Sequence, residues 1–200
     1  MQAGTQAARI DAKGLACRRG DRLLFAGLSL ALGPGEAVQL MGANGIGKSS
    51  LIRILAGLMR PYAGDVSRIG QVGLVDERPA LDPQLPLGRA LQFWRGIDGA
   101  ADVEQRPSLA LLELDGLTDV PVRYLSTGQR KRAALARLLG QGAPIWLLDE
   151  PLNGLDTGAI TLVEGLVANH CRGGGVVVIA SHQPFALAGL TRIAMADYAA

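Results

Sequence analysis

The net charge of this sequence is small, and it contains few aromatic residues and few cysteines. The formal charge of the 200 residues is +2, and aromatic residues make up 4%. A nucleic-acid partner would require a basic surface or rings that stack on bases, so we expect no nucleic-acid partner. Cys17 and Cys171 are the only cysteines, too few for a metal cluster or a disulfide framework. We interpret them as two ordinary thiols, with a single bridge as the alternative.

Long apolar runs are missing as well. No run approaches the roughly 20 residues that a helix needs to cross a bilayer. Met1–Ala8 lack the basic and apolar pattern of a secretion signal. The longest apolar runs, such as Val176–Ala180, have the length of buried strands. We therefore expect a cytoplasmic chain that can act at a membrane only through a partner.

Hydrophobic residues are plentiful, at 48%, which excludes a disordered chain and suits one globular domain. Short apolar runs alternate with helical patterns, and this predicts an α/β fold with a mainly parallel sheet. Three runs are predicted as central strands: Ala37–Met41, Ile145–Leu148 and Val176–Ala180. Glycines or polar residues follow each of them, at the sheet edge where ligands usually bind in such folds.

A glycine-rich segment follows the first of these strands and precedes a predicted helix. Glycines let backbone N–H groups approach phosphates closely, and a helix N-terminus favours anions. Lys48 would add a full charge near the β- and γ-phosphates, and Ser49 would offer a hydroxyl to Mg²⁺. The alternative is a glycine-rich turn with a chance lysine, which leaves the order of strand, loop and helix unexplained. The segment fits the pattern G-x-x-x-x-G-K-[ST] and consists of Gly42, Ala43, Asn44, Gly45, Ile46, Gly47, Lys48 and Ser49.

Two carboxylates end the second predicted strand. Asp149 fits the acid that holds Mg²⁺ in ATPases with a phosphate loop, and Glu150 is suited to orient or deprotonate the attacking water. An exposed acidic pair at a strand end is often inert. The phosphate loop in the same chain favours the functional interpretation.

The segment Leu125–Gln129 stands immediately before another predicted helix. With its hydroxyls and its glycine it forms a second candidate anion site; the alternative is a simple helix cap by Ser126 or Thr127. The segment resembles the signature motif of ABC ATPases, with Thr127 in place of the motif's first glycine. Leu152–Asp156 is similar to the D-loop of that family, and His182 follows the third strand, where the family has its switch histidine.

The resemblance to ABC ATPases implies a phosphate-loop fold, Mg²⁺ and ATP as ligands, and ATP hydrolysis. The family pairs head-to-tail, so Ser126 and Gly128 would contact the γ-phosphate bound at Lys48 of the other subunit in a homodimer. The resemblance implies catalytic roles for Lys48, Glu150 and His182, and metal contacts for Ser49 and Asp149. The implied nucleotide-binding residues are Gly42, Ala43, Asn44, Gly45, Ile46, Gly47, Lys48, Ser49, Ser50, Ser126, Gly128 and Gln129.

The sequence departs from the family at two positions. The aromatic residue that usually stacks on adenine aligns near Arg19, whose guanidinium plane can also stack on a base. The glutamine of the Q-loop aligns with Glu77, which is an additional candidate ligand for Mg²⁺.

Within the family, the closer resemblance is to the ATP-binding subunits of haem exporters in cytochrome c maturation. It is carried by Leu15–Phe25, by Trp146 and by Ser181–Pro184. It implies integral membrane subunits as partners and a peripheral position at the cytoplasmic face of the bacterial inner membrane. The alternatives are another small ABC transporter or a soluble ABC-type ATPase. A GTPase would need an Asn-Lys-x-Asp segment, which the sequence lacks.

By the same resemblance, residues 1–77 and 141–200 are predicted to form an ATPase core, and residues 78–140 a small helical subdomain inserted between the Q-loop and the signature motif. Prolines and helical patches between Arg78 and Tyr124 support the insertion. The three consecutive basic residues Arg130, Lys131 and Arg132 are interpreted as a solvated helix face rather than a nucleic-acid site.

Overall fold

The computed structural model describes residues 7–77, 79–99 and 106–200. In these parts of the chain it contains a five-stranded parallel sheet with the strand order β5-β6-β7-β3-β8. The prediction of an α/β fold with a mainly parallel sheet is confirmed. The strands of the parallel sheet are β3 (Ala37–Met41), β5 (Val72–Val75), β6 (Ile145–Asp149), β7 (Val176–Ala180) and β8 (Thr191–Ala194).

The central strands are buried on both faces, which explains their continuous apolar runs. In β6, Ile145 and Leu147 pack toward α1, whereas Trp146 and Leu148 pack on the opposite face of the sheet. β7 alternates in the same way. Because both faces are covered, the carboxyl edge of the sheet is the part of these strands that is open to ligands.

A second sheet is antiparallel and was not predicted. Its order is β2-β1-β4, and β1 shifts register against β2 between Ala12 and Arg18. Its apolar side covers α1 and so closes one side of the core. The strands of this sheet are β1 (Arg9–Arg19), β2 (Arg22–Leu32) and β4 (Ala63–Ile69).

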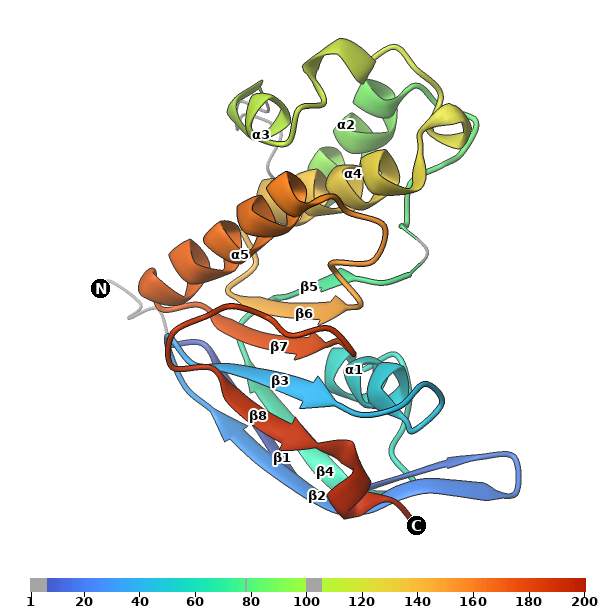
Figure 1. The fold of residues 1–200 in the computed structure, drawn as a ribbon, viewed down its shortest axis with the longest axis vertical. Coiled ribbons are helices and arrows are strands. Elements are labelled where there is room, and N and C mark those ends of the chain that lie inside the picture. The colour runs from blue at the N-terminus through green and yellow to red at the C-terminus, as the bar shows by residue number, and fades with distance from the viewer. Residues whose placement is uncertain (1–6, 78, 100–105) are drawn as a thin grey trace.

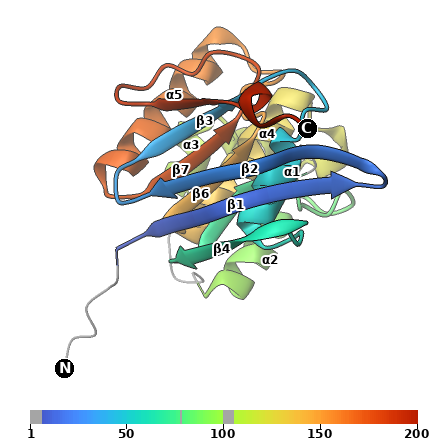
Figure 2. The same cartoon turned by 90° about the horizontal axis from the view of Figure 1, so that it is seen from below.

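The helices lie on both sides of the parallel sheet. α1 lies between the two sheets, whereas α4 and α5 pack on the other face of the parallel sheet (Figures 1 and 2). The helical elements are α1 (Lys48–Ala56), α2 (Leu87–Asp98), α3 (Arg106–Leu111), α4 (Thr127–Gln141), α5 (Thr157–Arg172) and three short 3-10 helices, η1 (Asp115–Leu117), η2 (Val122–Tyr124) and η3 (Met195–Tyr198).

The segment between β5 and α4 forms the upper lobe in Figure 1, which contains α2 and α3. α4 packs against α2 and also against β5, so one apolar cluster joins this lobe to the parallel sheet. The division into a core of residues 1–77 and 141–200 and a subdomain of residues 78–140 stays a prediction. Residue 78, with which the predicted subdomain begins, and residues 100–105 lie outside the described residues.

In the described parts of the chain, we find no helix with the length and apolar character needed to cross a membrane.

Candidate nucleotide site

The glycine-rich loop joins β3 to α1. Gly42, Gly45 and Gly47 have φ angles of 148°, 79° and 115°, a region that favours glycine. A Cβ atom at Gly47 would also lie 2.8 Å from the Phe25 ring. Gly47 is the N-cap of α1 and supplies no side-chain cap. The first N–H groups of α1 are therefore not occupied by a capping side chain and can bind a ligand. This geometry suits an anion.

Lys48 begins α1 and folds back over the loop. Its Nζ donates to the carbonyl oxygens of Gly42 at 2.7 Å and of Ala43 at 3.2 Å. The residue is 5% exposed. These contacts hold the ammonium group beside the loop, where a phosphate group would lie.

Ser49 and Asp149 connect α1 to the end of β6. The Ser49 hydroxyl donates to Oδ1 of Asp149 at 3.1 Å. Asp149 is buried, and burial raises the pKa of its carboxyl, a shift that the Ser49 hydrogen bond opposes. A hydroxyl and a carboxylate at one point are the hard oxygen ligands that Mg²⁺ prefers, so these residues fit the ion that the family implies.

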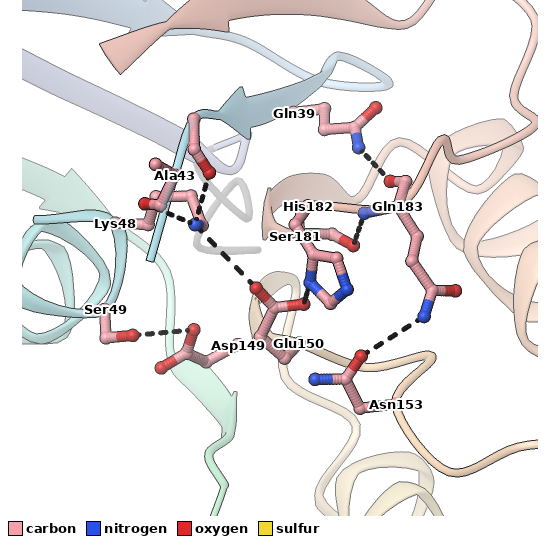
Figure 3. A network of polar contacts seen from close by, with 11 residues as sticks. Gln39, Ala43, Lys48, Ser49, Asp149, Glu150, Asn153, Ser181, His182 and Gln183 are labelled. Carbon is pink, nitrogen blue, oxygen red and sulfur yellow. Dashed lines mark hydrogen bonds and ion pairs between the residues drawn. The ribbon is translucent and has the colours of Figure 1, made fainter. Parts of the chain in front are cut away.

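The Glu150 carboxylate lies between the side chains of Lys48 and His182 (Figure 3). Its Oε1 is 3.9 Å from Nζ of Lys48, and its Oε2 is 2.9 Å from Nδ1 of His182. Glu150 has a φ of 46°, which is uncommon for a residue with a side chain. Its N–H donates to the carbonyl of Ala180 at 2.8 Å. The turn after β6 is thus fixed to β7, and it aims the carboxylate into the site.

A polar network ties the His182 loop to two other elements (Figure 3). The amide of Gln39 on β3 donates to the carbonyl of Gln183 at 2.6 Å, and Gln183 donates through Nε2 to Oδ1 of Asn153 at 3.3 Å. The N–H of Gln183 also donates to the Ser181 hydroxyl. The loop that carries His182 is therefore linked to β3 and to the turn after Glu150.

We expect Gln39→Ala to destabilise the fold. Gln39 is fully buried, so the variant loses a buried hydrogen bond and leaves the Gln183 carbonyl without this donor, at a cost of about 2 kcal/mol. The midpoint of thermal unfolding should fall by about 4–8 °C. Gln92→Ala, at an exposed position of α2, is the matched control and should unfold like the wild type. An equally stable Gln39→Ala would show that the network contributes nothing to stability.

These elements surround a cleft of about 570 Å³. Of the predicted residues, Ile46 packs inward on the loop, and Gly42 and Ala43 contribute the carbonyls that bind Lys48. Most of the others line the cleft. Its lining consists of Arg19, Leu24, Asn44, Gly45, Gly47, Lys48, Ser49, Ser50, Glu77, Thr127, Lys131, Asp149, Glu150, Asn153, Gly154 and His182.

The signature segment lies at the N-terminus of α4. Ser126 is its N-cap: the hydroxyl accepts from the Gln129 N–H at 3.2 Å, and the Gln129 side chain accepts from the Ser126 N–H at 2.8 Å. The capping alternative raised from the sequence is thus part of the structure. A Cβ at Gly128 would lie 3.0 Å from the Gly154 carbonyl. Ser126, Gly128 and Gln129 lie outside the lining of the cleft, whereas Thr127 belongs to it.

The interpretation of the three basic residues as a solvated face is wrong for Lys131. Lys131 is 7% exposed and lines the cleft. The side chains of its two neighbours make other contacts: Arg130 donates to the Leu125 carbonyl, and Arg132 forms an ion pair with Glu113. Consecutive helical residues point about 100° apart, so only one of the three can face the cleft.

Glu77 and Arg19, the two departures from the family pattern, both line the cleft. Glu77 follows Asp76, whose carboxylate accepts the Glu77 N–H at 2.5 Å and also pairs with Arg53. Arg19 donates to the sulfur of Met59 at 3.6 Å. Arg19 thus stands at the wall of the cleft, where a base could stack on its guanidinium plane.

Comparison with known proteins decides the family. The model of the ABC transporter family matches residues 25–153, which contain the phosphate loop, the signature segment and the two carboxylates. The chain belongs to the ABC transporter family. The predicted ABC ATPase fold and the predicted ATPase activity are confirmed.

One relative and two solved structures illustrate the similarity. A protein of Novosphingobium aromaticivorans named "Cytochrome c biogenesis ATP-binding export protein CcmA" is 60% identical over 92% of this chain and 94% of its own. A putative ABC transporter ATP-binding protein from Pyrococcus furiosus matches 96% of this chain and 100% of its own, with a TM-score of 0.82 and 20% identity. An ATP-binding cassette solved as a dimer with ADP and phosphate matches 87% of this chain and 88% of its own, with a TM-score of 0.73 and 23% identity.

The resemblance to haem-exporter ATPases is confirmed by the relative from Novosphingobium aromaticivorans, which is 60% identical over 92% of this chain. The two structures show the fold alone.

Proposed function

We propose that the chain binds Mg-ATP in the cleft and hydrolyses it to energise haem handling or export for the maturation of c-type cytochromes. The main support for an ATPase site is the position of the Glu150 carboxylate between Lys48 and His182, next to the phosphate loop. The biological role rests on the relative that is 60% identical and named for cytochrome c biogenesis.

The chemistry follows from the positions of the side chains. Hydrolysis of a phosphoanhydride needs positioning and charge stabilisation more than covalent catalysis. Lys48 neutralises charge on the γ-phosphate, and Ser49 with Asp149 would hold Mg²⁺, which supplies further charge stabilisation. Glu150 orients the attacking water and accepts its proton, while His182 holds the carboxylate through Nδ1.

We assign Ser126 and Gly128 to the nucleotide of a second copy in a head-to-tail homodimer. They lie outside the cleft of their own chain, although they occupy a helix N-terminus that suits an anion. The solved cassette with ADP and phosphate is a dimer. A partner's signature segment placed over the cleft would complete the binding of the γ-phosphate.

The membrane partner needs a docking surface, which we place in a second groove of about 370 Å³ between α1, β5 and α4. Leu58 is 68% exposed at this groove, and the guanidinium of Arg137 lies 3.6 Å from the centre of the Trp94 ring. An apolar floor with a cationic edge suits a short helix of an integral membrane subunit. The chain would then sit at the cytoplasmic face of the bacterial inner membrane. The groove is lined in part by Leu58, Leu74, Asp76, Leu81, Ala134 and Arg137.

The experiment is a co-purification from membranes with tagged Glu150→Gln protein, in mild detergent with Mg-ATP. This variant should stay in the ATP-bound state and retain its partners, because the water loses its general base. We expect mass spectrometry to recover membrane proteins of cytochrome c maturation. Recovery of a different permease would replace the haem role, and recovery of no membrane protein would favour a soluble role. The control is Lys48→Ala, tagged in the same way. Because this variant lacks the lysine that binds the γ-phosphate, ATP should not trap it, and less membrane partner should be recovered with it than with Glu150→Gln.

A further inference from the structure

Lys131 places a positive charge inside the nucleotide cleft of its own chain. It is 7% exposed and shares the cleft lining with Glu77, Asp149 and Glu150. Ionised lysines are seldom buried unless a negative charge compensates them. Neither the family pattern of the phosphate loop nor the catalytic geometry above uses this side chain.

The carboxylates around the cleft differ in their partners. Asp76 pairs with Arg53 at 3.0 Å, and Glu150 lies near Lys48 and His182. Asp149 is different, because its hydrogen bond is to the neutral hydroxyl of Ser49, and it is 4% exposed. A buried carboxylate with a neutral partner requires a nearby cation to remain ionised.

Lys131 meets this requirement. Burial lowers the pKa of Lys131, and the charges of Asp149, Asp76, Glu150 and Glu77 raise it, with Asp149 the strongest of the four. Burial raises the pKa of Asp149, the Ser49 hydrogen bond lowers it, and the charge of Lys131, which is buried in the lining of the same cleft, lowers it further. Glu77 adds a further negative charge to the same cleft.

We propose that Lys131 is a positioning residue that serves as the resident counter-charge of Asp149 and Glu77 and opposes the binding of a divalent cation. This inference rests on the magnesium–nucleotide site proposed above. The positive charge of Lys131 repels a cation bound by Asp149. The site therefore binds the metal weakly until the phosphate groups of the nucleotide add negative charge. Lys131 thereby makes metal binding depend on nucleotide.

The test is a titration of the full chain with Mn²⁺, followed by electron paramagnetic resonance, with and without a non-hydrolysable ATP analogue. Removal of one positive charge from the cleft should tighten nucleotide-free Mn²⁺ binding about tenfold or more in Lys131→Met, since tenfold is the effect of a unit charge about 6 Å from a divalent ion at the water-like dielectric of about 80, and a lower dielectric enlarges it. Lys131→Gln, which keeps a polar side chain, serves if the methionine variant does not fold. Lys131→Arg should bind Mn²⁺ like the wild type, because it keeps the charge.

Two further variants separate charge balance from packing. The double variant Lys131→Met, Glu77→Gln has the net charge of the wild type and should return to within about twofold of wild-type affinity. Arg132→Met, whose guanidinium pairs with Glu113 away from the cleft, should leave Mn²⁺ binding unchanged. Unchanged or weaker Mn²⁺ binding in both neutral variants, or a double variant as tight as Lys131→Met, overturns the inference. Failure of the wild type to bind Mn²⁺ even with the analogue would instead overturn the proposed nucleotide site.

Discussion

Replacing Glu150 by glutamine is expected to slow ATP hydrolysis about 10²–10⁴-fold, the usual contribution of a general base. Glutamine keeps the shape of the side chain but cannot accept a proton from water. Affinity for Mg-ATP should stay close to that of the wild type, because Lys48, Ser49 and Asp149 are unchanged. Phosphate release measures turnover, a fluorescent ATP analogue measures binding, and gel filtration with Mg-ATP should show a trapped dimer.

The control for this variant is Glu113→Gln. The Glu113 carboxylate has an exposed fraction of 79%, pairs with Arg132 and lies outside the cleft, so the same chemical change there should leave turnover unaltered. If Glu150→Gln hydrolysed ATP at the wild-type rate, another group would have to be the base. The contact between Glu150 and His182 would then be structural.

The central strands could be predicted from sequence because they are covered on both faces. Ala37–Met41 and Val176–Ala180 have the predicted bounds, and β6 extends the predicted Ile145–Leu148 by one residue. A continuous apolar run bounded by glycines or polar residues is a local signal, which needs no knowledge of the partner strands. The same is true of the phosphate loop, where the strand, the glycines and the helix are contiguous.

The antiparallel sheet could not be predicted in this way. β4 is exposed over most of its length, so it shows no alternation of apolar and polar residues. β1 contains register shifts that interrupt its own pattern. Its pairing with β4 joins segments that are distant in sequence, and local propensity carries little information about such contacts.

The burial of Lys131 contradicts its interpretation as part of a solvated face, although the sequence contains a signal for this burial. Leu135 and Leu138 belong to the apolar stripe of α4, and residue 131 lies one turn before Leu135 on the same face. Continuing the stripe toward the N-terminus would have placed Lys131 inside and its two neighbours outside. The network of Gln39, Gln183 and Asn153 has no comparable signal, because its members come from three separate elements.

Two chains that are each inactive are expected to regain ATP hydrolysis when mixed, if the dimer is head-to-tail. Lys48→Ala disables the phosphate loop. Gly128→Asp disables the signature segment, because it adds a negative charge and its Cβ would lie 3.0 Å from the Gly154 carbonyl. In a mixed dimer both defects fall on one nucleotide, and the other nucleotide meets an intact loop and an intact signature.

Random mixing makes about half of the dimers mixed, so about a quarter of the wild-type number of intact sites is expected. Phosphate release measures the gain. Lys48→Ala mixed with the double variant Lys48→Ala, Gly128→Asp is the control, since no dimer of this pair has an intact loop. If each nucleotide used the signature of its own chain, the first mixture would contain no intact site. Mixed dimers are verified through two different tags. If the first mixture then released no phosphate, the head-to-tail assignment of Ser126 and Gly128 would be rejected, and the nucleotide cleft with Lys48 and Glu150 would still stand.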